Sequence, residues 1–264
     1  MPVTSTKSAR VTAVRALHER KGRRAAGRFV VEGPQAVAAA LAAGAPLREV
    51  YATDEALMTD LVRALDAAGV EVVETSPQAL AAMAQTQQPQ GVVAVCDLLP
   101  NTPLDELLAG TGPVLVLEAL ADPGNVGTAI RAADAAGAAG VVLTVDSADP
   151  HNGKVVRSTA GSLFHLPICT GVTIDEVADA AVRAGRTLAV ATGDGDTDLV
   201  QAARTAQVDA TTVWVVGSEA HGVSPAARAR ATRAVRIPMT GRAESLNAGV
   251  AAAVVLYVTL AAAR

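Results

Sequence analysis

Aromatic residues are nearly absent from this 264-residue sequence, in which Phe, Trp and Tyr together make up 2%. The hydrophobic share of 50% is still enough for one large core or two modest ones, and we expect two domains. Their packing must depend on Ala, Val and Leu, whose small side chains allow helices to lie close to a sheet. Such a composition is typical of layered α/β proteins.

Cysteine is also scarce. Cys96 and Cys169 each lie in an apolar stretch, without CxxC spacing and without paired histidines, which argues against metal ligation. We therefore expect two buried free thiols, a reducing cytoplasm and no bound metal.

Long apolar runs and several well-known motifs are missing as well. The first residues contain no apolar run of signal-peptide length, and no uninterrupted stretch elsewhere is long enough to span a membrane, so we expect a soluble intracellular protein. The GxGxxG, GxxxxGK(S/T) and GxSxG motifs are also absent, which weighs against classical dinucleotide-binding, P-loop and hydrolase functions.

Basic residues are unevenly distributed, although the net charge is −4. Residues 1–28 contain eight Lys and Arg and a single acid, Glu19, and residues 228–242 contain five Arg and no acid before Glu244. Either cluster alone could equally be a solvated helix face. Two such clusters beside a ligand crevice favour contact with a phosphate backbone.

Strands and helices alternate along the whole chain. In the first part we expect strands at 29–32, from 50, at 70–73 and at 92–96, and helices at 8–22, 33–41, 55–68 and 77–84. In the second part we expect strands at 114–117, 141–144, 188–192, 211–216 and 234–238, with helices at 123–137, 155–161 and 174–184. The proline-rich segment 98–113 predicts a linker, giving domains at 1–105 and 112–264. Alternation predicts a mostly parallel sheet covered on both faces.

Two motifs near the carboxyl terminus, VVGSEAHGVS and RIPMTGRAESLN, each follow a predicted strand. Because α/β folds bind ligands at the carboxyl ends of parallel strands, these motifs predict one crevice. A third motif, DPGN, opens the helix that carries Arg131. Simpler roles remain open: Asn125 as a turn residue, Arg131 as a surface cation, Glu219 as a helix-start acid, His221 as structural, and Ser245 and Asn247 as caps.

The segments DPGNVGTAIRAADAAG, VVGSEAHGVS and RIPMTGRAESLNAGVAAAVVLY resemble the three ordered motifs of the SpoU (TrmH) branch of the SPOUT methyltransferases. FVVEGPQAVAAAL and QTQQPQGVVAV resemble, more weakly, the amino-terminal substrate-binding domain of many members, which is related to RNA-binding ribosomal proteins. The resemblance implies an α/β fold with a carboxyl-terminal parallel-sheet SPOUT domain, a deep trefoil knot and a homodimer. It also implies S-adenosylmethionine-dependent 2′-O-methylation of a ribose in structured RNA, without a metal.

The resemblance also assigns roles to individual residues. The cofactor is expected to contact Thr192, Gly193, Gly217, Ile237, Met239, Ser245, Leu246 and Asn247. Arg131 matches the catalytic arginine, as a base or, as we favour, as a group that grips phosphate and orients the hydroxyl. Asn125, Glu219, Ser245 and Asn247 match positions that organise Arg131 and the cofactor. RNA contacts are expected at Arg10, Arg23, Arg24 and Arg28 of the basic segment and, by resemblance, at Arg157.

Ribosomal RNA is the favoured substrate because of the extra domain, and transfer RNA is an alternative. A non-catalytic RNA-binding or assembly factor is a second hypothesis, and a small-molecule methyltransferase is a third. The third hypothesis would leave the basic amino terminus without a purpose.

Overall fold

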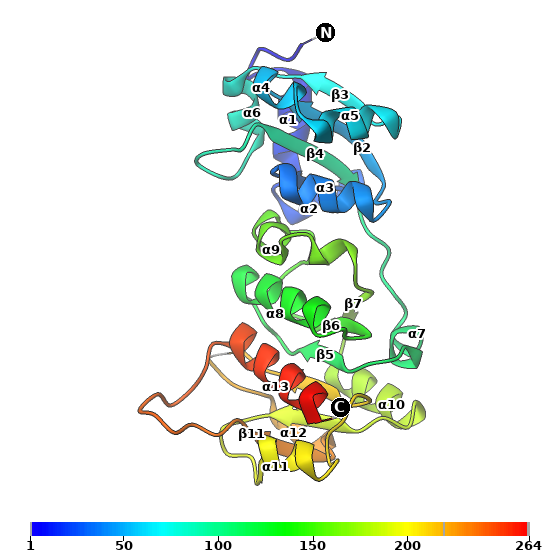
Figure 1. Ribbon diagram of the computed structural model, residues 1–264, viewed down its shortest axis with the longest axis vertical. Coiled ribbons are helices and arrows are strands. Elements are labelled where there is room, and N and C mark those ends of the chain that lie inside the picture. Colours follow the sequence, from blue (N-terminus) through cyan, green and yellow to red (C-terminus); the bar gives the residue numbers. More distant parts are fainter. Residues whose placement is uncertain (1, 219, 263–264) are drawn as a thin grey trace. The chain divides into compact units, whose positions relative to one another are not determined.

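A computed structural model describes residues 2–218 and 220–262 of the chain (Figure 1). The chain divides into two compact units. Unit 1 contains the residues up to Leu99 together with Asp149–His165, and unit 2 contains Pro100–Ala148 and the residues from Leu166 onward. The predicted domains, 1–105 and 112–264, are each continuous. The structure differs from that scheme in two respects: residues 149–165 leave the second stretch and pack with unit 1, and residues 100–105 belong to unit 2.

Unit 1 is a four-stranded sheet with helices around it. Its strands are β1 (Arg28–Glu32), β2 (Leu47–Ala52), β3 (Glu71–Glu74) and β4 (Val92–Asp97), in the order β1-β4-β2-β3. β4 runs antiparallel to β1 and β2, whereas β2 and β3 are parallel. Its helices are α1 (Ala9–Ala16), α2 (Arg20–Ala26), α3 (Pro34–Ala42), α4 (Asp54–Leu57), α5 (Asp60–Ala67), α6 (Pro77–Met83), α9 (Gly153–Thr159) and the short 3-10 helix η1 (Ser162–Phe164).

The predicted helix at 8–22 is instead two helices, α1 and α2, and Gly22 lies inside the second. The side chain of Arg23 donates to the carbonyls of Leu17 and His18, which satisfies the end of α1 and turns the chain. A Cβ on Gly22 would lie 1.8 Å from the carbonyl oxygen of Ala16, so only glycine allows this approach. The predicted helix at 55–68 is likewise divided into α4 and α5, because the extended backbone of Thr59 interrupts it.

Unit 2 contains a seven-stranded sheet in which every pairing is parallel, as predicted. The strands are β5 (Val114–Leu117), β6 (Gly140–Thr144), β7 (Ile168–Val172), β8 (Leu188–Ala191), β9 (Thr197–Asp198), β10 (Val213–Val216) and β11 (Arg233–Arg236). Their order is β7-β6-β5-β10-β8-β11-β9. Two late strands therefore lie between earlier ones, because β10 separates β5 from β8 and β11 separates β8 from β9.

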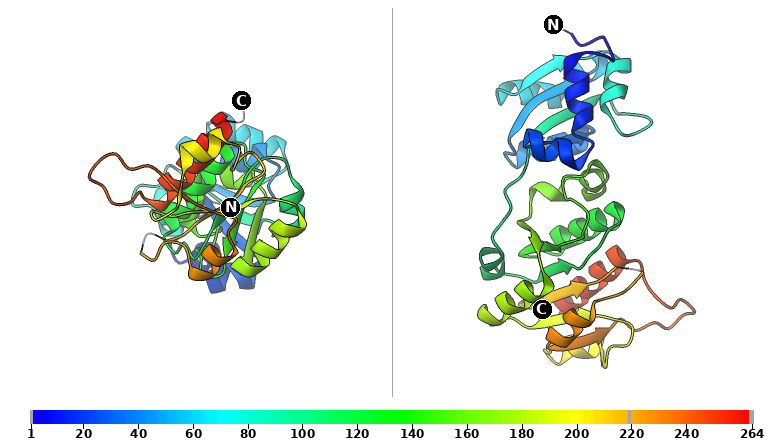
Figure 2. Two further views of the ribbon diagram at one scale, coloured as in Figure 1. Left: turned by 90° about the horizontal axis from the view of Figure 1, so that it is seen from below. Right: turned by 180° about the vertical axis from the view of Figure 1, so that it is seen from behind.

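Helices cover both faces of this sheet (Figures 1 and 2). α8 (Pro123–Ala135) and α13 (Ala248–Ala262) lie side by side on one face, and α11 (Leu199–Arg204) packs against α13. α7 (Leu104–Ala109), α10 (Ile174–Arg183) and α12 (Pro225–Arg230) cover the other face.

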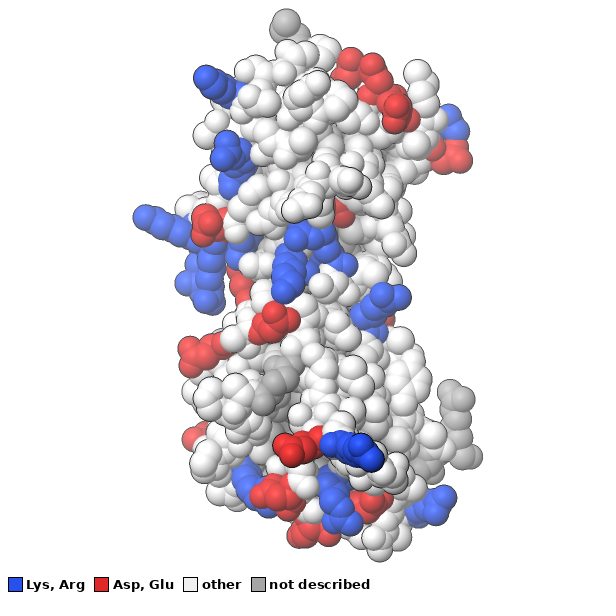
Figure 3. Space-filling model, turned by 90° about the vertical axis from the view of Figure 1, so that its left-hand side faces the viewer, with Lys and Arg blue, Asp and Glu red and all other residues white. Residues whose placement is uncertain are grey.

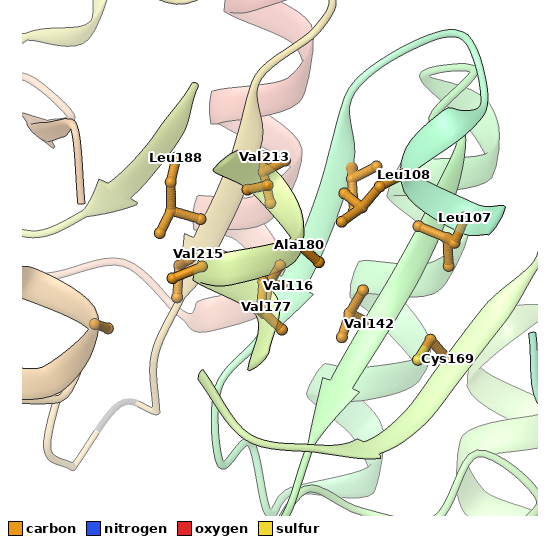
Figure 4. Packing of buried hydrophobic residues seen from close by; sticks show 14 of the residues in the cluster. Leu107, Leu108, Val116, Val142, Cys169, Val177, Ala180, Leu188, Val213 and Val215 are labelled. Atoms are coloured by element: carbon orange, nitrogen blue, oxygen red, sulfur yellow. The ribbon is translucent and has the colours of Figure 1, made fainter. Parts of the chain in front are cut away.

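The side chains of successive residues in each strand point to opposite faces of the sheet. Val213 and Val215 of β10 join the aliphatic cluster beneath α7, α10 and α12, which Figure 4 shows. Trp214, between them, donates from its indole nitrogen to the hydroxyl of Thr259 in α13, at 3.2 Å. The buried residues are mostly Val, Leu and Ala, as the composition predicts.

The predicted linker is only partly a linker. Leu107 and Leu108 are buried against the sheet, so residues 104–109 form the helix α7 and belong to unit 2. The prolines and glycines at each end of this helix mark turns, but the leucine pair between them is apolar enough to be drawn into a core. Cys96 and Cys169 are buried free thiols, as expected. Among the described residues, no helix is long and apolar enough to cross a membrane.

Candidate active site

A cavity of about 210 Å³ opens at the carboxyl ends of β8, β10 and β11. We call it the strand-end cavity. It is lined by the residues that follow these three strands and by the segment that leads into α13. All the predicted cofactor positions except Asn247 line it: Thr192, Gly193, Gly217, Ile237, Met239, Ser245 and Leu246. The sequence motifs therefore converge on one crevice, as predicted, and their roles toward a ligand stay predictions.

Close backbone contacts shape this cavity. A Cβ on Gly217 would lie 2.0 Å from the carbonyl oxygen of Gly222, and the backbone of Gly222 donates to the carbonyl of Ser218 at 2.8 Å. Gly222 has a φ of +63°, which favours glycine. In the loop between β8 and β9, a Cβ on Gly195 would lie 2.6 Å from the backbone nitrogen of Arg236. At Gly217, therefore, the wall of the cavity is backbone that leaves no space for a side chain.

Glu118, which the sequence analysis did not identify, anchors the loop after β10. Its carboxylate is buried, with 7% exposure, and lies just beyond β5. It accepts from the backbone N–H of Ser224 at 2.9 Å and from the hydroxyl of Ser224 at 2.6 Å. The same hydroxyl accepts from the N–H of Ala227 and caps α12. An acid directly after four buried residues was the available signal, but it resembles an ordinary strand end.

A second contact holds the loop after β8. The hydroxyl of Thr192 donates to Asp194 at 2.6 Å, and Arg228 of α12 forms an ion pair with the same carboxylate. Hydrogen bonds from Thr192 and Arg228 lower the pKa of Asp194. The carboxylate is therefore ionised at neutral pH and keeps Thr192 against the cavity.

The motifs at the starts of α8 and α13 meet through their asparagines. The side-chain amide of Asn247 donates to the Oδ1 of Asn125 at 2.8 Å, and its own oxygen caps α13 by accepting from Gly249 and Val250. Asp122 caps α8 by accepting from the N–H of Asn125. Asn247 is thus a helix cap, one of the two roles left open, and it also fixes the first turn of α8.

Arg131 does not line the strand-end cavity. It is an exposed residue of α8, three positions beyond Thr128, whose side chain lies against Gly249 of α13. Glu219 lies outside the described residues, so the structure does not place it. His221 is exposed, and its backbone N–H donates to the hydroxyl of Ser218.

The prediction for Arg23 is corrected by its burial. Arg23 is 2% exposed, and its guanidinium donates to the carboxylate of Asp149 at 2.7 Å as well as to the carbonyls at the end of α1. A buried, fully paired guanidinium cannot reach an RNA phosphate, so the role of Arg23 is structural. Of the other predicted RNA contacts, Arg24 is exposed. Arg10 and Arg28 pair with acids at the surface, and Arg157 pairs with Glu32.

Three of the five arginines of the second basic run are held by partners within unit 2, whereas Arg233 and Arg242 are exposed. Arg230 pairs with Asp175 and Asp179 of α10, Arg228 pairs with Asp194, and Arg236 donates to the carbonyls of Gly195 and Asp196. In Figure 3 the basic side chains at the lower end, which belongs to unit 2, lie among acidic ones. The acids that pair with Arg228 and Arg230 come from distant segments, so the sequence window alone suggests more positive charge than the fold presents.

A parallel sheet that binds at the carboxyl ends of its strands defines a class of α/β ligand-binding proteins. Comparison with known proteins narrows this class. The family described as "SpoU rRNA Methylase family" matches residues 112–257, and the "MRM3-like substrate binding domain" matches residues 8–94. The chain belongs to the SpoU rRNA methylase family.

Two curated relatives match most of the chain. A Bacillus subtilis (strain 168) protein named 23S rRNA (guanosine(2553)-2′-O)-methyltransferase RlmP is 34% identical, over 97% of both chains. A Streptomyces viridochromogenes protein named 23S rRNA (uridine(2479)-2′-O)-methyltransferase is 33% identical, over 91% of this chain and 85% of its own.

Solved structures share the fold of the whole chain. The AdoMet-bound rRNA methyltransferase from Sinorhizobium meliloti has a TM-score of 0.85 at 30% identity, covering 98% of this chain and 97% of that one. The SpoU methyltransferase AviRb from Streptomyces viridochromogenes, in complex with AdoMet, has a TM-score of 0.83 at 31% identity, covering 96% and 97%.

Proposed function

We propose that this protein is an S-adenosylmethionine-dependent RNA methyltransferase that acts on the 2′-hydroxyl of a ribose in structured RNA, with ribosomal RNA as the first choice. The observation that carries the proposal is the strand-end cavity, into which three separate strand-end loops bring the family's motif residues. The relatives named as 23S rRNA 2′-O-methyltransferases support the substrate class.

The residues of the strand-end cavity fit the methyl donor. Ile237, Met239 and Leu246 offer apolar contacts for the adenine ring, and the backbone of the glycine loops offers hydrogen bonds to its edge. Glu244 adds a carboxylate that suits a positively charged amino group. At about 210 Å³ the cavity is smaller than the roughly 300–1,000 Å³ of typical ligand sites, so it would enclose only part of the donor. When bound, S-adenosylmethionine supplies a methyl group on a positively charged sulfonium.

The remaining motif residues prepare the acceptor. A ribose hydroxyl is a weak nucleophile and must be aligned within near-attack distance. The planar guanidinium of an arginine presents several N–H donors, so Arg131 is suited to gripping a phosphate and orienting the hydroxyl. The hydrogen bond between Asn125 and Asn247 keeps α8, and with it Arg131, in register with α13. We assign Ser245 to the donor and Glu219 to the organisation of Arg131, as the family's motifs imply.

A second copy of the chain would complete the site. On α13, Val250 and Tyr257 are 44% and 51% exposed, and Val254 lies between them on the same stripe. Exposed valine and tyrosine in a row are costly to leave in water, which supports a homodimer through unit 2. In such a dimer Arg131, which does not line its own cavity, would be available to the partner's cavity.

We include a trefoil knot of this unit in the proposal, because the resemblance to the family's motifs implies it, and the insertion of β10 and β11 between earlier strands is compatible with it. The cytoplasm is the proposed location, because ribosomal RNA is the proposed substrate.

Burial raises the pKa of the Cys96 thiol to about 12, so that thiol stays protonated.

A transfer assay tests the function. Purified protein is incubated with methyl-labelled S-adenosylmethionine and ribosomal RNA, and ribose methylation is read as resistance of one linkage to alkaline hydrolysis. Arg131→Ala is expected to lower the rate by at least about a hundredfold, because a misaligned hydroxyl is lost from near-attack geometry. Arg204→Ala changes another exposed helix arginine of unit 2 and is expected to keep the wild-type rate.

The alternatives give different results in the same assay. Methylation of transfer RNA but not of ribosomal RNA would show that transfer RNA is the substrate. Tight RNA binding without transfer to any RNA would select the non-catalytic factor. Full activity of Arg131→Ala would remove that residue from the mechanism.

A further inference from the structure

We propose that unit 1 contains a cavity that holds one unpaired nucleobase of the RNA. This inference rests on the proposed function, since the RNA is taken to be the substrate of methylation. The cavity, which we call the glutamine cavity, encloses about 300 Å³ and is lined by Gln35, Gln88, Gln90, Pro89 and Arg157, among others. All of these residues belong to unit 1.

A buried carboxylate fixes the rim of the glutamine cavity. Glu32, 8% exposed at the end of β1, accepts from the backbone N–H groups of Gln85 and Thr86, at 2.6 and 3.3 Å, and from the hydroxyl of Thr86 at 3.0 Å. Arg157 donates to the same carboxylate at 3.2 Å. The loop that presents Gln88 and Gln90 is therefore held at its root before any ligand arrives, which lowers the entropic cost of binding.

Gly33 brings the loop close to the start of α3. Its φ is +90°, and a Cβ there would lie 3.1 Å from the Oε1 of Gln90, so a side chain at this position would be strained and crowded. The amide of Gln90 thus lies against the backbone that leads into α3. Gly33 also leaves the first turn of α3 without a side-chain cap. Backbone N–H groups of that turn add donors beside the glutamines.

The chemistry of the lining selects a base. Each glutamine amide carries both a donor and an acceptor, which is the combination needed to pair with the edge of a nucleobase. The charge of Glu32 is already satisfied by its donors, so the cavity does not repel a polyanion strongly. Arg157 retains 28% side-chain exposure and can stack its planar guanidinium on a base or contact a phosphate. Sequence-specific proteins read RNA mostly through bases splayed out of loops.

RNA binding tests the proposal independently of turnover. We would measure the dissociation constant of full-length protein for fragmented ribosomal RNA by filter binding over a range of salt concentrations. The triple variant Gln35→Ala, Gln88→Ala, Gln90→Ala is expected to bind about tenfold more weakly or worse. The slope of log K against log salt should not change, because that slope counts phosphate contacts and not base contacts.

Gln87→Ala is the matched control. Gln87 is exposed in the same loop but does not line the cavity, so its affinity for RNA should remain that of the wild type. Gln88→Glu is a second variant, at an exposed position where folding is insensitive to the change, and it should weaken binding as well. Thermal unfolding confirms that each variant is folded.

An unchanged dissociation constant in the folded triple variant would overturn the proposal, and so would a weaker affinity that is accompanied by a smaller salt slope. Failure of wild-type protein to bind ribosomal RNA would overturn it too. Methyl transfer is measured separately. If the wild type transfers no methyl group but binds RNA through the three glutamines, the proposed function fails and the base cavity stands. If transfer proceeds and the glutamines have no effect, the reverse holds.

Discussion

Each of the two units contains a buried glutamate that anchors a loop, but the partners of the two glutamates differ. In each, a buried glutamate at the end of a strand holds the backbone N–H and the hydroxyl of a distant loop, and that loop lines a cavity. Within the described residues, the partner of Glu118 in unit 2 is Ser224, a neutral residue. Glu32 in unit 1 accepts from Gln85 and Thr86 but also from the guanidinium of Arg157.

The difference lies in what the anchored loop presents. The loop held by Glu118 presents glycine backbone to the strand-end cavity, where a single added Cβ would collide. The loop held by Glu32 presents exposed amide side chains to the glutamine cavity. A wall of backbone tolerates little variation and suits a ligand that is always the same. A wall of side chains can change residue by residue and suits the recognition of different RNAs.

Removing Glu118, the glutamate whose partner is a neutral serine, should have the largest effect. Glu118→Ala leaves the N–H and hydroxyl of Ser224 without their acceptor, and we expect a loss of about 3 kcal/mol in unfolding free energy, since a hydrogen bond to a charged group contributes about 1.5–3 kcal/mol. Urea unfolding measures this loss. Calorimetry should also show a much weaker affinity for S-adenosylmethionine, while RNA binding is retained.

Glu118→Gln is the matched variant, because its amide oxygen can still accept one bond from Ser224. It should fall between the wild type and Glu118→Ala in both measurements. Wild-type donor affinity in Glu118→Ala would mean that this anchor does not shape the strand-end cavity.

Removing Arg157, the positively charged partner of Glu32, leaves the buried glutamates of both units with neutral donors. Arg157→Ala leaves Glu32 with neutral donors only, as Glu118 has. Because Arg157 is partly exposed, we expect a smaller loss of stability, about 1 kcal/mol. Arg63→Ala, which breaks the highly exposed pair with Asp60, should cost less than about 0.5 kcal/mol. Equal losses in the two variants would show that the charge on Arg157 adds nothing to the anchor.

Mild acid should give the smallest effect, a loss of stability in unit 1 as Asp149 becomes protonated. Burial alone would raise the pKa of Asp149 in unit 1, but hydrogen bonds from His151 and Arg23 outweigh burial and lower the pKa below its ordinary value. The contribution of Asp149 is therefore complete above the unfolded pKa of about 3.9 and is lost as the pH falls toward the folded value. At pH 4 the loss is still below about 0.5 kcal/mol and grows at lower pH.

Hydrogen exchange of the unit 1 amides between pH 7 and pH 3 measures this loss. Asp149→Asn cannot titrate and should flatten the dependence. A pH dependence that is the same in wild type and Asp149→Asn would assign the acid sensitivity to other carboxylates.

Local patterns in the sequence predicted many of the elements and a crevice at the strand ends, whereas the individual residues that line the strand-end cavity came from the resemblance to the family's motifs. The strands β5, β6, β8 and β10 are short apolar runs bounded by turn residues, and glycines mark the places where backbones approach closely. These features depend on neighbouring residues, so they can be read within a short window.

Features that depend on distant partners could not be predicted. Ser224, the partner of Glu118, lies 106 positions away. Asp149 lies 126 positions beyond Arg23, so a basic helix concealed a buried ion pair. The acids that neutralise Arg228 and Arg230 come from other elements. The insertion of β10 between β5 and β8 is equally invisible to periodicity, which gives the type of an element but not its place in a sheet.

The late insertion of β10 and β11 determines when the sheet of unit 2 can form during translation. A ribosome releases β5 and β8 long before the strand that belongs between them, so the middle of this sheet cannot close until residue 216 has emerged, and its far side waits for residue 236. Until then the nascent polypeptide carries unsatisfied strand edges, which attract other chains. The amino-terminal sheet also receives its last strand, β4, between the earlier strands β1 and β2, but it is complete at residue 97. Premature termination in the last quarter of the message should therefore yield an aggregating product rather than a shortened, working one.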